Sequence, residues 1–273
     1  MGLIDGRVAV VTGSGRGIGR AAVLTFVREG AACVINDVDS GPAEETLAMV
    51  GEIGGRAVVC CGSVADPTFT DELMACAAEN FGGLDILVNN AGITRDKVIH
   101  KMSDADWDFV IDVSLRGTFN CIRSSSPYIR EASKKEVAER GDVDYHRKIV
   151  NFFSTAAIRG NPGQANYTAA KMGVVGLTRT IAQEWGRFRV NVNAVGPGFT
   201  DTRLTKPRDE MEAAGCEEIG IPSKFRDAMI ARCPFGRPAE PQDIANVILF
   251  FSSPLSDYVT GQEINVSGGY QIP

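Results

Sequence analysis

Short apolar runs alternate with helix-like stretches along most of this chain. Seven runs of mostly apolar residues predict strands at residues 7–12, 31–36, 56–61, 84–89, 148–153, 189–194 and 263–266. Stretches with a helical spacing of apolar positions lie between them, at 17–29, 42–53, 66–80, from about 107 to beyond 123, at 164–185 and at 242–251; Ser103 is the predicted cap of the fourth. Strands that are apolar throughout and alternate with helices predict a parallel sheet that is covered on both faces. We therefore expect an α/β fold with a single doubly wound parallel sheet of seven strands and helices on both faces.

The alternation continues from end to end without a linker or an internal repeat, so we expect residues 1–273 to form a single domain. Two segments depart from it. Residues 133–147 (SKKEVAERGDVDYHR) are highly charged, and we interpret them as solvated surface. Residues 205–227 are polar, contain glycine and proline, and follow candidate site residues described below. Long segments of this kind are often functional, which predicts a lid over a substrate pocket.

Composition and charge exclude several classes of function. The 273 residues carry a net charge of −6, which is not the electrostatic footprint of a nucleic-acid-binding protein. No run of about 18 apolar residues could span a membrane, and Asp5 and Arg7 interrupt any signal peptide, so we expect a cytoplasmic protein. The seven cysteines are scattered without a CxxC pair, and the only histidines are His100 and His146. We expect reduced thiols and no protein-bound metal.

A glycine-rich loop follows the first predicted strand. Residues 12–19 read TGSGRGIG and lead directly into the first predicted helix, which is the context that makes a GxGxxG pattern informative. Glycines permit a tight turn and a close approach of the backbone to a pyrophosphate, and the N–H groups of the helix N-terminus face the phosphates. We therefore predict a dinucleotide site of the Rossmann type with six contacting loop residues: Gly13, Gly15, Arg16, Gly17, Ile18 and Gly19.

The residue after the second predicted strand indicates which dinucleotide binds. Asp37 lies 18 residues after Gly19, near the spacing at which an acidic side chain accepts hydrogen bonds from the adenosine ribose. Its charge would repel a 2′-phosphate, whereas the guanidinium of Arg16 could pair with one. Because two anions at hydrogen-bond distance are costly, we expect NAD(H) to be preferred, with NADP(H) as the alternative.

Three further residues form a candidate catalytic group. Tyr167 and Lys171 are four residues apart in a predicted helix and so share one face of it. The ordinary pKa of a tyrosine is about 10, and a neighbouring ammonium and a nicotinamide cation would both lower it. Ser154 follows the fifth predicted strand, 13 residues before Tyr167, and its hydroxyl could hold a substrate oxygen beside the phenol.

Together these segments resemble the classical short-chain dehydrogenase/reductase family over nearly the whole chain. The matching segments are TGSGRGIG at 12–19, NNAG at 89–92, Ser154, YTAAK at 167–171 and Pro197-Gly198. The resemblance implies that Tyr167 is the general acid/base, that Lys171 binds the nicotinamide ribose and lowers the tyrosine pKa, and that Ser154 orients the substrate carbonyl. It also implies further cofactor contacts: Asn90 and Gly92 on the adenosine ribose side, and Pro197, Gly198, Thr200 and Thr202 beside the nicotinamide.

Two positions depart from the usual pattern of that family. In VSLRGTF at 113–119, Ser114 replaces an asparagine that helps to hold a water in a proton relay. We expect the shorter serine to keep the relay through water, at a lower rate. After the third predicted strand, Ser63-Val64 replaces the Asp-Val pair that grips adenine. The serine can still accept one hydrogen bond, and the backbone of Val64 is unaffected.

The resemblance implies reversible hydride transfer between NAD(H) and a carbonyl or secondary alcohol. The stretches NNAGITRDK, GNPGQANY and PGFTDTRLT are similar to 3-oxoacyl-carrier-protein reductases and 3-hydroxyacyl-CoA dehydrogenases, so a 3-oxoacyl thioester on acyl carrier protein or coenzyme A is the first choice. Those biosynthetic reductases generally use NADPH, whereas Asp37 favours NAD(H). An NAD-dependent dehydrogenase of another secondary alcohol is therefore the alternative. A non-catalytic dinucleotide sensor is a more distant alternative. The segment VTGQEINVSGG implies a homotetramer, with a dimer as second choice.

Overall fold

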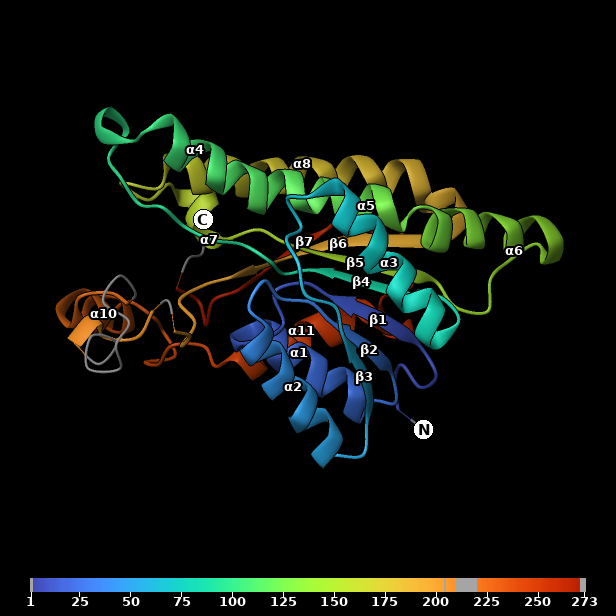
Figure 1. Ribbon diagram of the computed structural model, residues 1–273. Helices are drawn as coiled ribbons and strands as arrows, with labels where there is room; N and C mark the ends of the chain where they lie inside the picture. Colours follow the sequence, from blue (N-terminus) through green and yellow to red (C-terminus); the bar gives the residue numbers. More distant parts are fainter. Residues whose placement is uncertain (1, 204, 210–219, 271–273) are drawn as a thin grey trace.

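One parallel sheet forms the centre of the fold in the computed structural model, which describes residues 2–203, 205–209 and 220–270. Seven strands lie in the order β3-β2-β1-β4-β5-β6-β7, and every neighbouring pair is parallel (Figure 1). Their bounds are β1 Val8–Val11, β2 Ala32–Ile35, β3 Arg56–Val59, β4 Ile86–Asn89, β5 Arg147–Phe152, β6 Val190–Pro197 and β7 Glu263–Val266. The prediction of a seven-stranded parallel sheet is confirmed.

Helices cover both faces of the sheet, as the apolar strands predicted. α1, α2 and α11 pack on one face, while α3, α5 and α8 pack on the other (Figure 1). The helices are α1 Gly17–Arg28, α2 Ser40–Glu52, α3 Pro67–Phe81, α4 Asp104–Ile111, α5 Gly117–Ser125, α6 Ala132–Arg140, α7 Thr155–Arg159, α8 Ala165–Trp185, α10 Ser223–Ala231 and α11 Pro241–Ser252. None of the helices in the described part of the chain is long and apolar enough to cross a membrane.

Strand β1 shows why the strands are apolar at every position. Ala9 and Val11 pack into the core beneath α1 and α11, while Val8 and Val10 pack into the core beneath α3 and α8. Successive side chains of a strand point to opposite faces, so a sheet that is covered twice requires an apolar residue at each position. All four side chains are buried.

The strand order places a crevice outside the carboxyl ends of β1 and β4. The chain passes from β1 outward through β2 to β3, and then returns to add β4 on the other side of β1. Val10 pairs with Val34 on one side and with Leu87 on the other. Ligands of doubly wound sheets bind where the strand order reverses in this way. The glycine loop after β1 and the NNAG segment after β4 both lie at this point.

The helix predicted to begin near Trp107 and to run past Arg123 continues to Arg140 in the structure. It begins at Asp104, where Ser103 Oγ accepts a hydrogen bond from a backbone N–H of the first turn at 3.1 Å. The backbone stays helical to Arg140 through α4, α5, α6 and two π-helical turns. Gly141 ends the helix with a φ of +81°, a left-handed conformation that glycine adopts easily. The last turns are highly charged, so the apolar periodicity stops before the helix does.

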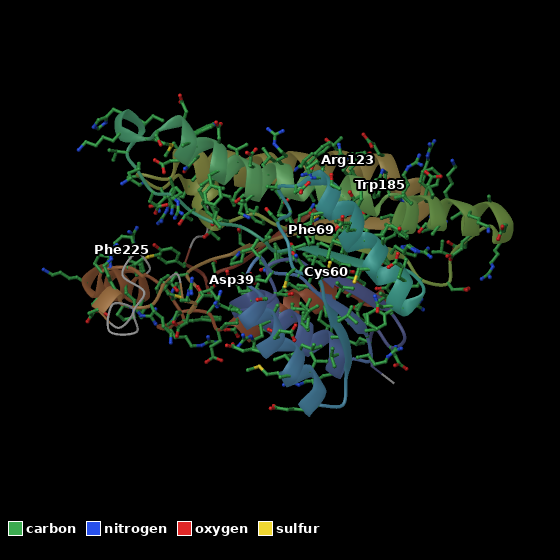
Figure 2. All side chains as sticks on the ribbon, in the orientation of Figure 1. Asp39, Cys60, Phe69, Arg123, Trp185 and Phe225 are labelled. Carbon is green, nitrogen blue, oxygen red and sulfur yellow. The ribbon has the colours of Figure 1, made fainter. Side chains whose placement is uncertain are left out.

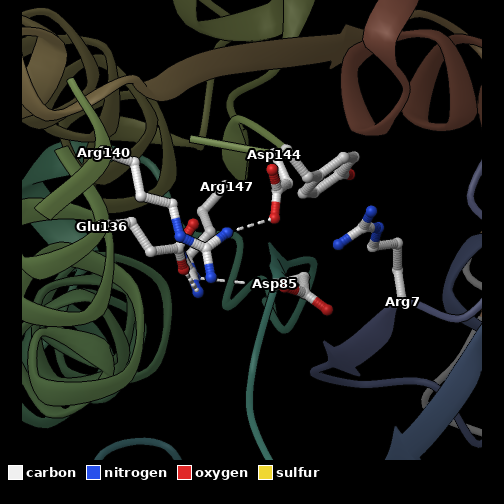
Figure 3. A pocket seen from close by; sticks show the side chains of 7 residues that line it. Arg7, Asp85, Glu136, Arg140, Asp144 and Arg147 are labelled. Carbon is white, nitrogen blue, oxygen red and sulfur yellow. Dashed lines mark hydrogen bonds and ion pairs between the residues drawn. The ribbon is translucent and has the colours of Figure 1, made fainter. Parts of the chain in front are cut away.

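The charged segment 133–147 is not solvated surface throughout, so that expectation is wrong in part. The guanidinium of Arg147 is mostly buried and lies 2.6 Å from Glu136 Oε1. Figure 3 shows this pair beside a cavity of about 170 Å³, which is also lined by Asp85 and Arg7. The ion pair forms only when α6 packs near the amino ends of β4 and β5. Charges that a sequence pattern assigns to water are therefore partly enclosed by the fold.

The lid predicted at 205–227 is described only in part, because residues 210–219 lie outside the described residues. Its last part forms the helix α10. In Figure 1 this helix lies to one side of the sheet, apart from the helices that cover its faces. Its role as a cover for a substrate stays a prediction.

Candidate active site

Ser154, Tyr167 and Lys171 lie together beyond the carboxyl end of β5. Ser154 immediately precedes α7, and Tyr167 and Lys171 lie one turn apart near the start of α8. The hydroxyl of Ser154 lies close enough to the Tyr167 phenol to lower its pKa. Lys171 Nζ donates a hydrogen bond to Phe152 O at 3.1 Å and lies 5.7 Å from the centre of the Tyr167 ring. The structure thus places the three candidate catalytic residues in one cluster.

Burial governs the protonation of this cluster. It raises the pKa of Tyr167; the nearby hydroxyl of Ser154 lowers that pKa and the negative charge of Asp96 raises it, so the net shift is upward. Burial also lowers the pKa of Lys171 to about 8, because the ammonium loses hydration. The protein's own groups therefore do not produce the expected lowering of the tyrosine pKa by Lys171. Dehydration of the phenolate is the largest influence on its pKa.

Asn166 holds Tyr167 in place, although the sequence reasoning did not single it out. Its fully buried side-chain amide donates to Arg95 O and to Asp106 O, both at 3.0 Å. Asn166 Oδ1 accepts a hydrogen bond from Tyr167 N at 2.8 Å. The start of α8 is thus tied to the segment after β4 and to α4. Asparagine is favoured at helix starts because its side chain binds free backbone groups, and this signal could have identified the position.

A row of three polar side chains near Tyr167 was also not predicted from the sequence. Gln164 Nε2 donates to Asp96 Oδ2 at 2.9 Å, and Asn161 Nδ2 donates to Gln164 Oε1 at 2.9 Å. Burial raises the pKa of Asp96, and its hydrogen bond with Gln164 lowers it, with a net upward shift. This row of side chains links the segment after β4 to the segment before α8. It places a carboxyl group close enough to Tyr167 to affect its pKa.

The glycine loop has a backbone that side chains would obstruct. Gly13 and Gly17 have φ values of +62° and +54°, which favour glycine. A Cβ at Gly19 would lie 2.4 Å from Gly13 O, and a Cβ at Gly15 would lie 2.7 Å from Asp37 Oδ2. The loop leads into α1, whose free N–H groups and dipole favour a phosphate. These residues fit the pyrophosphate of a dinucleotide.

Two acidic residues follow β2, where the sequence reasoning considered one. Asp37 Oδ2 accepts a hydrogen bond from Gly15 N at 2.9 Å. Arg16 Nη1 lies 2.8 Å from Asp39 Oδ2, and both of these side chains are partly exposed. Asp39, labelled in Figure 2, therefore engages the one guanidinium that was considered for a 2′-phosphate. The Asp-Val-Asp spacing at the end of the second predicted strand was the available signal.

The segment after β4 contacts both the glycine loop and the catalytic cluster. Asn90 Nδ2 donates to two carbonyl oxygens of the glycine loop, at 2.8 and 2.9 Å, so its amide braces the backbone of that loop. A Cβ at Gly92 would lie 3.1 Å from Lys171 Nζ and 3.6 Å from Ser114 Oγ. The ammonium of Lys171 and the hydroxyl of Ser114 thus both lie near Gly92.

Ser114 lies in a π-helical turn, Asp112–Arg116, within the long helix. Its side chain is fully buried, and Ser114 Oγ has no hydrogen-bond partner among the residues that the structure describes. Buried hydroxyls without a partner are rare, and π-helical turns are frequent at functional sites. Ser114 therefore offers a hydrogen-bonding group beside Lys171.

The remaining candidate cofactor residues lie along the same edge of the sheet. Ser63 and Val64 follow β3, and Val64 packs into the core beneath α3. Ile18 packs against the opposite core from α1. The others end β6 or follow it within five residues: Pro197, Gly198, Thr200 and Thr202. Parallel strands bring all of these segments to one edge.

Comparison with known proteins agrees with this arrangement. Residues 13–271 match the family described as enoyl-(acyl carrier protein) reductase. The chain belongs to the short-chain dehydrogenase/reductase family. It is 36% identical over 269 residues to the 3-oxoacyl-(acyl-carrier-protein) reductase of Thermotoga maritima, over 98% of this chain and 99% of that protein. It is 37% identical over 264 residues to the reductase of the same name from Staphylococcus aureus, over 96% of each chain.

Another relative is named for a different substrate. The chain is 39% identical over 272 residues to the (2S)-((R)-hydroxy(phenyl)methyl)succinyl-CoA dehydrogenase subunit BbsD of Thauera aromatica, over 98% of each chain. Family membership confirms the resemblance inferred from the motifs. As a short-chain dehydrogenase/reductase, the chain is a nicotinamide-dependent oxidoreductase acting on CH–OH donors.

Replacing Gly19 by alanine is expected to weaken binding of NADH by about tenfold or more. The added methyl group would approach Gly13 O to 2.4 Å and Asn90 Nδ2 to 2.7 Å, and overpacking of this kind costs about 1–3 kcal/mol. Fluorescence titration with NADH measures the change. Gly51→Ala in α2 is the matched control, because a Cβ there meets no atom within 4 Å. Unchanged affinity for NADH in a folded Gly19→Ala variant would contradict the assignment of the glycine loop as the pyrophosphate site.

Proposed function

We propose that this chain reduces the 3-oxo group of an acyl thioester to a 3-hydroxy group, with NADH as the hydride donor. The observation that carries the proposal is the cluster of Ser154, Tyr167 and Lys171 at the same sheet edge as the glycine loop. It offers two hydroxyls to one substrate oxygen, with a buried ammonium beside them.

Ser154 and Tyr167 act on the carbonyl oxygen of the substrate. Both hydroxyls donate hydrogen bonds to this oxygen, and Tyr167 transfers its proton to it as the carbonyl carbon receives a hydride. The nicotinamide of the bound cofactor supplies that hydride. The carbon gains a hydride, the oxygen gains a proton, and the product is a secondary alcohol. In the reverse direction the Tyr167 phenolate accepts the proton.

Lys171 acts through its charge and its position. Its ammonium is held by Phe152 O and lies beside the ring of Tyr167, where it stabilises the phenolate left by proton transfer. It also donates hydrogen bonds to the ribose next to the nicotinamide. Because burial lowers its pKa to about 8, the ammonium can pass a proton to the tyrosine near neutral pH.

Ser114 completes a path for that proton in this proposal. Its unpartnered hydroxyl and Lys171 Nζ both lie near Gly92. One water between them would bond to both groups, as a relay requires. A serine reaches less far than an asparagine, so the relay depends on water here.

The preference for NADH rests on the charges after β2. Asp37 Oδ2 accepts from Gly15 N and Asp37 Oδ1 accepts from Asp39 N at 3.2 Å, and each oxygen keeps a second lone pair that can accept a hydrogen bond from the adenosine ribose. A 2′-phosphate would meet the carboxylates of both Asp37 and Asp39. Arg16 offers it little compensation, because its guanidinium is paired with Asp39.

Relatives support a thioester substrate and also the second candidate. Two of them are reductases of 3-oxoacyl groups on acyl carrier protein, and BbsD is named for a dehydrogenase of a CoA thioester. The second candidate is an NAD-dependent dehydrogenase of another secondary alcohol, which Asp37 and the likeness to BbsD favour. A non-catalytic dinucleotide sensor is disfavoured, because a sensor has no need of the acid/base cluster.

Assembly and location are part of the same proposal. Trp107, Phe109 and Phe119 on the long helix are all more than a third exposed, and apolar side chains of this size on one helix support self-association. We expect a homotetramer, with a dimer as the alternative, acting on a small-molecule or thioester substrate in the cytoplasm. The segment 205–227 is assigned to the substrate wall.

Acetoacetyl-CoA should be reduced with loss of NADH absorbance at 340 nm, and Tyr167→Phe should lose most of this activity. Removing a general acid lowers kcat by about 10²–10⁴-fold, while binding of NADH stays close to that of the wild type. Tyr258→Phe is the control, since that side chain is fully exposed.

The outcomes of that assay separate the candidates. Wild-type kcat in Tyr167→Phe would refute its role as the acid. Activity only on simple ketones or secondary alcohols would favour the second candidate, and reduction of crotonyl-CoA alone would indicate an enoyl substrate. Tight NADH binding without turnover of any substrate would favour the sensor.

Asp37→Asn should reduce the preference for NADH over NADPH by about tenfold. The substitution removes one charge from the ribose site and keeps the side-chain size, although one of the two accepting oxygens becomes an NH2 donor. A close like-charge contact costs about 1.4 kcal/mol or more. The ratio of kcat/KM for the two cofactors is the measurement. Asp39→Asn is the companion variant, which also releases Arg16. A wild-type preference for NADPH would overturn the assignment.

The rate of reduction should fall as the pH rises through about 8. Burial lowers the pKa of Lys171 to about 8, so its ammonium is present below that pH and is lost above it. The pH profile of kcat/KM reports the pKa of such a group in the free enzyme. Lys171→Arg keeps its charge at every pH and should remove the fall, although kcat will be lower. Persistence of the same fall in this variant would assign it to another group.

A further inference from the structure

The helix α10 has little apolar packing to hold it against the fold. None of its residues, Ser223–Ala231, is buried, and Phe225, labelled on α10 in Figure 2, is 50% exposed. In Figure 1 the helix lies apart from both helix layers. Most helices in proteins are stabilised by burial of an apolar face. The orientation of α10 therefore depends on its polar contacts.

Arg226 makes those contacts. Its side chain is only 15% exposed, and Arg226 Nη1 donates to Thr205 O at 2.8 Å. Arg226 Nη2 lies 3.3 Å from Asp201 Oδ1, and the guanidinium lies 5.4 Å from the centre of the Phe199 ring. The planar guanidinium suits several simultaneous contacts in a way that a lysine ammonium does not.

Asp201, in the segment after β6, is the charged partner of this guanidinium. Its Oδ1 atom is buried and accepts no hydrogen bond of good geometry from the described residues. The Asp201 side chain is 39% exposed, so water solvates part of the carboxylate and the positive charge of Arg226 faces the shielded oxygen. The helix and the segment after β6 are thus held together by charge.

The segment after β6 reaches the glycine loop through two threonines. Thr202 N donates to Thr205 Oγ1 at 3.0 Å, and Thr205 Oγ1 donates in turn to Thr200 O. A Cβ at Gly17 would lie 3.6 Å from Thr202 Cγ2, so the methyl group of Thr202 faces the phosphate cradle. Hydrogen bonds therefore link Thr202 through Thr205 to Arg226, and the methyl group of Thr202 lies near Gly17.

We infer that Arg226 is a positioning residue that couples the dinucleotide site to the wall of the substrate site. A dinucleotide in the glycine loop fixes Thr200, Thr202 and Thr205, and Arg226 transmits that order to α10. Arg226 need not touch either ligand. The substrate half of this role rests on the proposed function, whereas the link between the cofactor and α10 does not.

Coupling of this kind is reciprocal. If the bound cofactor raises the affinity for the thioester by some factor, the thioester raises the affinity for the cofactor by the same factor. Typical couplings between sites are about 5–150-fold. Loss of Arg226 should remove the factor itself, whereas a general loss of stability would weaken both ligands and leave the factor unchanged.

The first experiment is hydrogen exchange on the whole chain with and without NADH. We expect NADH to slow exchange in the glycine loop and, by about tenfold, in α10 of the wild type. In Arg226→Gln the glycine loop should still be protected, while α10 should no longer respond. Lys224→Gln is the matched control, because it removes one positive charge from an exposed position on the same helix.

The second experiment measures binding of 3-hydroxybutyryl-CoA by calorimetry, alone and with saturating NADH, which cannot react with it. We expect NADH to lower its Kd by about tenfold in the wild type and in Lys224→Gln, and to have no effect on it in Arg226→Gln. Arg226→Lys keeps a positive charge near Asp201 but loses the planar guanidinium that makes several contacts at once. It should therefore retain only part of the coupling.

The two experiments keep the failures apart. If NADH protects α10 in the wild type but no thioester binds, the proposed substrate is wrong and the coupling stands. If α10 does not respond to NADH in the wild type, or responds equally in Arg226→Gln, the inference is wrong. Arg226→Lys and the wild-type response decide the question even if Arg226→Gln fails to fold.

Discussion

The parallel pairing of β1 with β4 is the constraint on which the rest of this structure depends. Because every strand runs in the same direction, every connection must cross back over a face of the sheet, and helices then cover both faces. The carboxyl ends of the strands therefore meet along one edge. β2 and β3 extend to one side of β1, and β4 begins the other side, so the edge opens between β1 and β4. The glycine loop and the catalytic cluster share that opening.

The site places two ionisable groups where neither is fully hydrated. Burial shifts the pKa of Tyr167 upward and that of Lys171 downward to about 8, so both shifts favour the neutral forms. A phenolate on Tyr167 and an ammonium on Lys171 would stabilise each other when both are present. Each charged form is unfavourable without the other. The chemistry thus depends on pairing charges at the moment of proton transfer. The hydrogen bonds of Asn166 hold Tyr167 in the required position.

Sequence reasoning succeeded where the signal was local. The apolar strands and the glycine loop were recognised because burial and backbone conformation impose a residue type at each position. It failed at 133–147 and at Asp39, where a charged residue finds its partner only after the chain has folded. The same applies to Arg226, whose partners lie 21 and 25 residues earlier in the chain. Polar residues in a sequence show no preference for one distant partner over another.

By itself the sequence determined the class of fold, and it predicted the dinucleotide loop and the three residues of the proposed catalytic cluster, because each depends on short-range spacing. A helical repeat places Tyr167 and Lys171 on one face, and glycines mark the backbone that a pyrophosphate can approach. Only the tertiary structure decided how these groups are charged and what holds them. The dehydration of Tyr167, the pairing of Arg16 with Asp39 and the unpartnered hydroxyl of Ser114 all result from packing between distant segments. Electrostatic free energies depend on distance and burial in three dimensions, and neither is written in the order of the residues.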